Sequence, residues 1–119
     1  RFAVNIERGR RLQWMVNYVD ESNYAWFQIG RDNFIRTVVS QGQRSKPVEV
    51  NHQLADFRAV VVEIEVADNE IVHRLQRGGE WIELDRWKFT GADFAKGQFG
   101  FRLPGKDELS VASLTFSSR

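Results

Sequence analysis

Apolar side chains recur at every second position along most of the chain, and this alternation limits the folds that the chain can adopt. Segments 2–6 and 12–18 both show it. The strongest run lies within 58–67, where β-branched residues share one face: Val60, Val62, Ile64 and Val66. A period of two matches a β-strand, and no window of a dozen residues carries a helical stripe. The sequence therefore predicts an all-β protein.

Short clusters of Asp, Asn and Gly separate the alternating segments. These residues tolerate the backbone conformations that tight turns require. The clusters stand at 20–23, 31–33, 68–70, 77–80 and 104–108. Their spacing predicts about ten short antiparallel strands, which is typical of a two-sheet β-sandwich.

The length of 119 residues is enough for one hydrophobic core. We therefore expect a single domain over 1–119. Because the strand alternation starts almost at Arg1, we also expect this domain to be an excised part of a larger protein.

The charge balance argues against two classes of partner. Lys and Arg number 17 and Asp and Glu 16, which gives a net charge of +1. Nucleic-acid-binding proteins concentrate a basic excess on one face, and the densest basic run, 8–11, is predicted to be a charged turn. The longest apolar run, 59–62, is far shorter than the roughly 20 residues that span a bilayer. We expect neither nucleic-acid binding nor membrane insertion.

Several kinds of catalytic chemistry lack the residues they need. The chain has no cysteine, so disulfides, thiolate zinc sites and a cysteine nucleophile are excluded. It has no Gly-x-Ser-x-Gly motif for a serine nucleophile and no glycine-rich phosphate loop followed by a helix. We expect no bound cofactor.

The two histidines are not spaced as metal ligands. His73 alternates with Ile71 and Leu75, which favours a hydrogen-bonded core residue, and His52 lies in a predicted loop. The acidic loops at 20–23 and 107–108 are too poor in oxygen ligands for a calcium cage. We therefore expect no metal site.

Three patterns follow one another along the chain. They are NY…F.I…N..R…V within 23–38, VVVEIEV…N.IVHRLQ.GG.WIELD.W within 60–87, and G.FGFRLPGKDE…V..L.F within 97–116. This order resembles the concanavalin A-like lectin/glucanase jelly rolls, and it is closest to the laminin-G-like and 3-keto-disaccharide-hydrolase-like domains of bacteria.

The resemblance implies a jelly roll of two antiparallel sheets, one flat or convex and one concave, with sugar-binding residues on the concave sheet and its rim. It also implies a domain of a secreted or cell-envelope bacterial protein. The chain is shorter than many such domains, so one or two peripheral strands, at the N-terminus, are expected to be absent.

Aromatic residues supply the clearest binding candidates, because sugar-binding proteins stack aromatic rings on pyranose faces. Tyr24, Trp26 and Gln28 share one face of their predicted strand. The opposite face is purely apolar, which makes it the expected core side: Ala25, Phe27 and Ile29. We expect Arg36 to lie beside Trp26 or Gln28 across a hairpin, and Trp81 to stand on a solvated face.

Each tryptophan also has an ordinary structural interpretation. Core or rim packing would account for Trp26 and Trp81, Trp14 is expected in the core, and Trp87 is expected to close the sandwich edge. The first hypothesis is a non-catalytic module that uses Tyr24, Trp26, Gln28, Arg36 and Trp81 to bind a glycan or a neighbouring protein domain.

Paired carboxylates support an alternative hypothesis, a glycoside hydrolase-like enzyme of the same fold. Glu63 and Glu65 project from one face of a strand, as the catalytic pair of a glucanase does, and Glu83 and Asp85 form a second predicted pair. The glucanase pattern requires a further acid where this chain has Ala67, so a solvated strand face is the preferred interpretation. A purely structural accessory domain is the third hypothesis.

Overall fold

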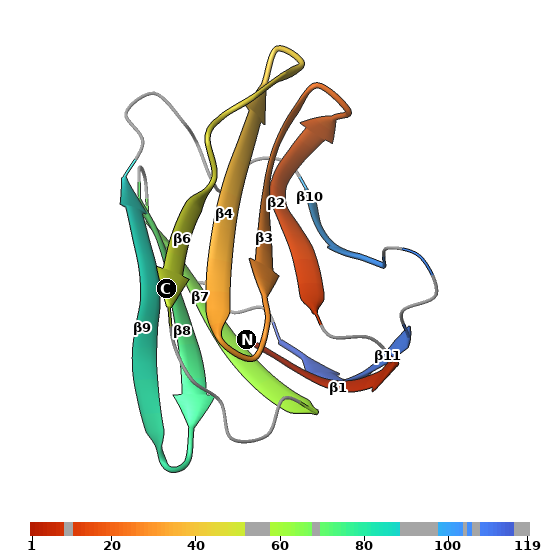
Figure 1. The fold of residues 1–119 in the computed structure, drawn as a ribbon, viewed down its shortest axis with the longest axis vertical. Helices are drawn as coiled ribbons and strands as arrows, with labels where there is room; N and C mark the ends of the chain where they lie inside the picture. The colour runs from red at the N-terminus through yellow and green to blue at the C-terminus, as the bar shows by residue number, and fades with distance from the viewer. Residues whose placement is uncertain are drawn as a thin grey trace.

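The computed structural model describes residues 1–8, 11–51, 58–67, 70–88, 98–103, 105 and 108–115. The described residues form eleven strands, in two antiparallel sheets that lie face to face (Figure 1). The all-β sandwich predicted from the alternation is confirmed. The basic run at 8–11 falls partly outside the described residues.

Sheet A has the strand order β11-β1-β7-β8-β9. Its bounds are β1 Phe2–Arg8, β7 Ala59–Ala67, β8 Glu70–Arg77, β9 Glu80–Lys88 and β11 Glu108–Leu114. The first and last strands pair along 2–8 and 108–114, so the two ends of the chain close one side of this sheet (Figure 1).

Sheet B has the order β10-β2-β3-β4-β5, and β6 also pairs with β4. Its bounds are β2 Leu12–Asp20, β3 Asn23–Ile29, β4 Asn33–Ser40, β5 Gln43–Arg44, β6 Val48–Asn51 and β10 Gln98–Arg102. The short strand β5 lies in the polar segment 41–47 between β4 and β6. A two-residue turn, Gln41 and Gly42 with φ of 52° and 77°, folds it back onto β4.

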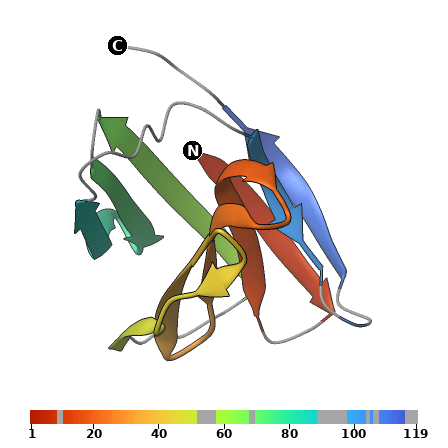
Figure 2. The ribbon, with the colours of Figure 1, turned by 90° about the horizontal axis from the view of Figure 1, so that it is seen from above.

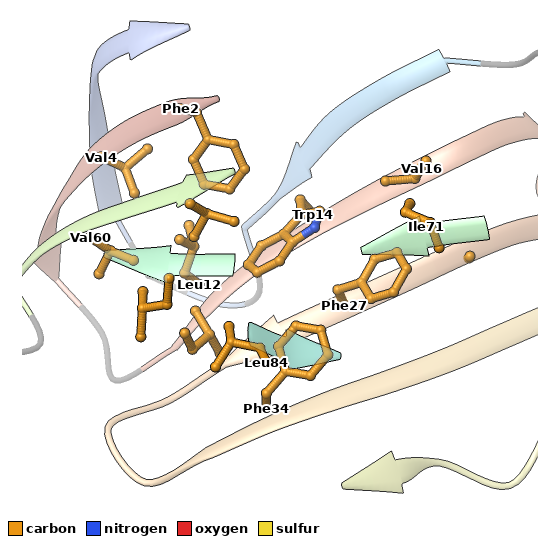
Figure 3. Packing of buried hydrophobic residues seen from close by; sticks show 14 of the residues in the cluster. Phe2, Val4, Leu12, Trp14, Val16, Phe27, Phe34, Val60, Ile71 and Leu84 are labelled. Carbon is orange, nitrogen blue, oxygen red and sulfur yellow. The ribbon is translucent and has the colours of Figure 1, made fainter. Parts of the chain in front are cut away.

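The core fills the space between the sheets, and Trp14 lies near its centre (Figure 3). Trp14 is fully buried and contacts three aromatic rings from different strands, with centroids 5.4 Å from Phe2, 6.1 Å from Phe27 and 6.2 Å from Phe34. Sheet A contributes apolar residues of β7 and β8 to the same core: Val60, Val62, Ile71 and Leu75. In the view from above, sheet A strands β7 to β9 lie opposite β4 and β6 (Figure 2). The predicted core positions are confirmed for Trp14 and for the face of β3 that Ala25, Phe27 and Ile29 form.

Two β-bulges change which side chains face the core. In β2 the register shifts between Val16 and Asp20, where Asn17 has a positive φ of 58°. The alternation predicted Tyr18 on the same face as Trp14, but the extra residue moves Tyr18 to the outer face, where its ring lies 5.6 Å from that of Tyr24. The prediction for Tyr18 was therefore wrong.

The second bulge lies in β9, opposite the neighbouring residues His73 and Arg74 of β8. His73 pairs with Asp85 and Arg74 pairs with Glu83, so Leu84 is the extra residue. The bulge turns Asp85 toward the interior while Glu83 faces outward. The predicted Glu83/Asp85 carboxylate pair on one face is therefore wrong.

His73 is a fully buried core residue, as predicted. Its Nε2 accepts a hydrogen bond of 3.0 Å from Trp14 Nε1, which requires the neutral imidazole. Burial, with a smaller contribution from the Arg36 charge, lowers the pKa of His73 from 6.5 to about 3. The imidazole therefore stays uncharged in the folded protein at neutral pH.

This depressed pKa predicts that stability falls as the pH is lowered below about 6.5. Between the two pKa values the unfolded chain binds a proton at His73 and the folded chain does not, so the free energy of unfolding drops by up to about 1.4 kcal/mol per pH unit. His73→Leu removes this dependence, as measured by urea denaturation between pH 6.5 and 4.5.

Asp85 acts in the opposite direction and must be separated from this effect. Burial raises the pKa of Asp85 above its ordinary value of 3.8. Between 3.8 and the raised pKa, the folded chain binds a proton at Asp85 and the unfolded chain does not, so the free energy of unfolding increases as the pH falls through this range. The difference between wild type and His73→Leu at each pH isolates His73. If the free energy of unfolding changed equally with pH in wild type and in His73→Leu, the depressed pKa of His73 would be contradicted.

Candidate functional site

The predicted binding residues of β3 lie together on the outer face of sheet B. Tyr24, Trp26 and Gln28 are all half-buried, and they point away from the core that Phe27 and its neighbours fill. We name the outward side chains of the three central strands the Trp26 face: Gln13, Met15 and Tyr18 of β2, Tyr24, Trp26 and Gln28 of β3, and Ile35, Thr37 and Val39 of β4.

Strand register sets the order of side chains across this face. Trp26 lies between Met15 and Thr37 in one row. In the next row Gln13 and Gln28 are paired, and the Gln13 Nε2 amide donates a hydrogen bond to Gln28 Oε1. The Trp26 face thus presents an aromatic ring with neighbouring amide and hydroxyl groups.

Two arginines from the edges of the sheet converge on Trp26. The guanidinium carbon of Arg102, on β10, lies 5.6 Å from the centroid of the indole ring, and that of Arg44, on β5, lies 6.0 Å from it. Both distances fall within the range of a cation–π contact. Both arginine side chains are exposed, so they frame the indole from two sides of the sheet.

Three buried polar atoms of the Trp26 face have no hydrogen-bond partner within the described part of the chain. They are Gln13 Oε1, Trp26 Nε1 and Thr37 Oγ1. Buried polar groups are normally paired, so a cluster of unpaired ones within adjacent rows calls for an explanation. This face has hydrogen-bonding capacity that the described protein groups do not use.

Arg36 does not belong to the Trp26 face, so the prediction that it lies beside Trp26 or Gln28 was wrong. Arg36 shares the inner side of β4 with Phe34, and its Nη1 lies 2.7 Å from Asp85 Oδ2 across the sandwich. The guanidinium carbon also lies 5.1 Å from the centroid of the Trp87 ring. The pair is mostly buried, with 15% of the Arg36 side chain and 9% of the Asp85 side chain exposed.

Trp81 lies in sheet A, so the structure does not bring it together with Trp26. It is half-buried on β9, opposite Gln76 of β8, and the guanidinium carbon of Arg1 lies 4.9 Å from the centroid of its ring. Any binding role of Trp81 would therefore be separate from the Trp26 face.

The candidate catalytic carboxylates Glu63 and Glu65 share the outer face of β7, as predicted. Arg74 lies between them on β8, with its Nη1 2.7 Å from Glu65 Oε2 and 3.5 Å from Glu63 Oε1. Arg1 also contacts Glu63 at 2.8 Å. Both carboxylates are thus held in an ion-pair network with Arg74 and Arg1.

An open cavity of about 560 Å³ lies at the edge of the sandwich, and none of the residues that define the Trp26 face lines it. It lies between the β4–β5–β6 region and Trp87 of β9, and Arg36, Arg44 and Lys46 contribute to its wall. Arg44 therefore links this cavity with the indole of Trp26.

The described residues contain no group of three His, Asp or Glu side chains that could hold a metal ion. In the 20–23 turn, Asp20 Oδ1 accepts hydrogen bonds from the Ser22 backbone and the Asn23 side chain, which is a local turn contact. His52 and Asp107 lie outside the described residues. Across the described ranges there is also no helix long and apolar enough to cross a membrane.

Sequence reasoning missed eight residues of this site: Gln13, Met15, Tyr18, Ile35, Thr37 and Val39 of the Trp26 face, and the arginines Arg44 and Arg102 beside it. Gln13 alternates with the core residues Leu12 and Trp14, so its outward position was available from the pattern. Asn17 gave a signal for the bulge that moves Tyr18, because Asn tolerates positive φ. Arg44 and Arg102 reach Trp26 from non-adjacent strands, and nothing local in the sequence indicates that.

Comparison with known proteins gives no match, whether to a family model, to a curated protein or to a solved structure. The resemblance to concanavalin A-like domains stays a hypothesis, because many unrelated families share a two-sheet β-sandwich. Function is therefore inferred from the geometry of the Trp26 face.

Proposed function

We propose that this chain is a non-catalytic carbohydrate-binding module, and that the Trp26 face is its binding surface. The observation that carries the proposal is the position of Trp26, a half-buried indole on an outer sheet face among unpaired polar atoms. Aromatic side chains of this kind stack on the apolar face of a sugar ring, while nearby polar groups bind its hydroxyls.

The polar atoms around the indole suit hydroxyl groups in particular. Gln13 Oε1 accepts a hydrogen bond, Trp26 Nε1 donates one, and Thr37 Oγ1 does either. A sugar hydroxyl is both donor and acceptor, so it complements all three. All three atoms are buried, so a sugar hydroxyl reaches them only if neighbouring side chains move; two exposed side chains, Arg44 and Arg102, lie against the indole ring.

The chain order of the strands supports the same proposal. β11 pairs with β1 in sheet A and β10 pairs with β2 in sheet B, so the last two strands return beside the first two. This nesting is compatible with a jelly roll of a secreted or envelope bacterial protein, for which the sequence resemblance implies glycan binding.

Replacement of Trp26 tests the proposal. Trp26→Ala is expected to raise the Kd for the bound glycan roughly 30-fold, equivalent to about 2 kcal/mol, because the stacking surface is lost. Glycan-array screening identifies the ligand and isothermal titration calorimetry measures the affinity.

Trp81→Ala is the matched control, because it removes a half-buried tryptophan from the other sheet. It should leave the affinity unchanged. An array on which the wild type binds no glycan, or equal losses for the two variants, would contradict the assignment. Hydrolysis of an array glycan that Glu63→Gln abolishes would instead favour the enzyme hypothesis.

A further inference from the structure

We infer that the ligand of the Trp26 face is an anionic saccharide, which carries carboxylate or sulfate groups. This inference rests on the proposed carbohydrate-binding function and names the class of glycan. Its basis is the convergence of two like charges, Arg44 and Arg102, on one indole ring.

The two positive charges are not balanced within the Trp26 face. All of the residues that define this face are uncharged, and Arg44 and Arg102 form no ion pair with any carboxylate in the described part of the chain. Glu49 of β6 pairs with Ile35, so its carboxylate stands on the same outer side at the sheet edge, where it accepts a hydrogen bond from Asn33. Other arginines of this protein do pair with carboxylates, as Arg36, Arg74 and Arg86 show.

Stacking on an indole leaves the donors of a guanidinium group available. A guanidinium that contacts a ring through its flat face keeps its N–H groups, which lie in its plane, for other partners. These N–H groups match the geometry of a carboxylate or sulfate and donate two parallel hydrogen bonds to it. A glycan stacked on Trp26 would therefore meet a charge-matching donor on each side of the ring.

The position of Gly100 leaves room for such a ligand. Gly100 lies on β10 opposite Met15, in the same row as Trp26, and a Cβ atom added there would have no neighbour within 4 Å. The outer face of β10 at Gly100, beside Met15, is therefore open.

Two matched pairs of probes test the inference by calorimetry. An oligogalacturonate is compared with its full methyl ester, and dextran sulfate is compared with dextran, so that only the charge changes within each pair. We expect at least one anionic probe to bind about tenfold or more tightly than its neutral counterpart, because charge-assisted hydrogen bonds are the stronger ones. This preference should shrink as salt is raised from 50 to 300 mM.

Arg44→Gln and Arg102→Gln should each weaken binding of the preferred anionic probe about tenfold and leave binding of its neutral counterpart unchanged. Arg31→Gln is the control, because it removes the same charge from an exposed turn at the end of sheet B. Equal binding of charged and neutral probes, or equal losses for all three variants, would overturn the inference.

If neutral and charged probes bind equally and Trp26→Ala abolishes both, the proposed function stands and the anionic class falls. If none of the four probes binds, the anionic class falls, and the glycan array decides whether the proposed function stands.

Discussion

Trp14→Ala is expected to lower the free energy of unfolding by about 4 kcal/mol, which is the largest loss that we expect from any single substitution in this protein. The indole is fully buried between the sheets, and it contacts aromatic rings of β1, β3 and β4. Its removal leaves a cavity that the sheets cannot close, and it leaves His73 Nε2 without its donor. A small single domain has only about 5–15 kcal/mol of stability, so much of it would be lost.

Urea denaturation monitored by circular dichroism measures this loss. Trp14→Phe is the informative intermediate, because it keeps an aromatic ring but not the hydrogen bond to His73, and it should cost about 2 kcal/mol. If Trp14→Ala cost no more than an ordinary surface substitution, about 0.5 kcal/mol, the central position of Trp14 in the core would be wrong.

The second large effect concerns the ion pair between the sheets. Asp85→Ala is expected to lower the free energy of unfolding by about 3 kcal/mol, because it leaves the mostly buried Arg36 charge without its counter-charge and its hydrogen-bond acceptor. Among the described residues, Arg36 would then keep its contact with the Trp87 ring.

Glu83→Ala is the matched control, since Glu83 lies two residues away on the same strand. Its partner Arg86 and Glu83 itself are both nearly half exposed, so breaking this pair should cost much less. A double variant, Arg36→Met with Asp85→Leu, should recover much of the stability lost in Asp85→Ala, because it removes both charges together. Equal losses for Asp85→Ala and Glu83→Ala would show that Asp85 faces solvent and that the β9 bulge is misplaced.

Alternation along the chain was sufficient to predict the sandwich and most of its core. The inward face of β3 was predicted correctly, because it is purely apolar, and so was that of β7 at Val60, Val62 and Ile64, whereas Val66 near the end of β7 is exposed. His73 was also placed correctly, since it alternates with Ile71 and Leu75.

The candidate site was predicted only where it lies on a single strand. Tyr24, Trp26 and Gln28 follow from the alternation of β3, whereas the position of Arg36 depends on the register between β3 and β4 and on the Asp85 partner in the other sheet. A bulge inverts the faces of every later residue, and Leu84 carries no local signal for one. The approach of Arg44 and Arg102 to Trp26 is set by tertiary structure, which alternation within single strands does not predict.

The most direct test of the proposed site follows the four indole N–H signals by ¹H–¹⁵N NMR during titration with the tightest-binding glycan of the array. Signals are assigned with single Trp→Phe variants. The Trp26 signal should shift progressively, since that N–H has no partner among the described groups, and the Trp14 signal should stay fixed because His73 holds it in the core. A titration that shifts the Trp81 signal and leaves Trp26 unmoved would contradict the assignment of the binding surface to the outer face of sheet B.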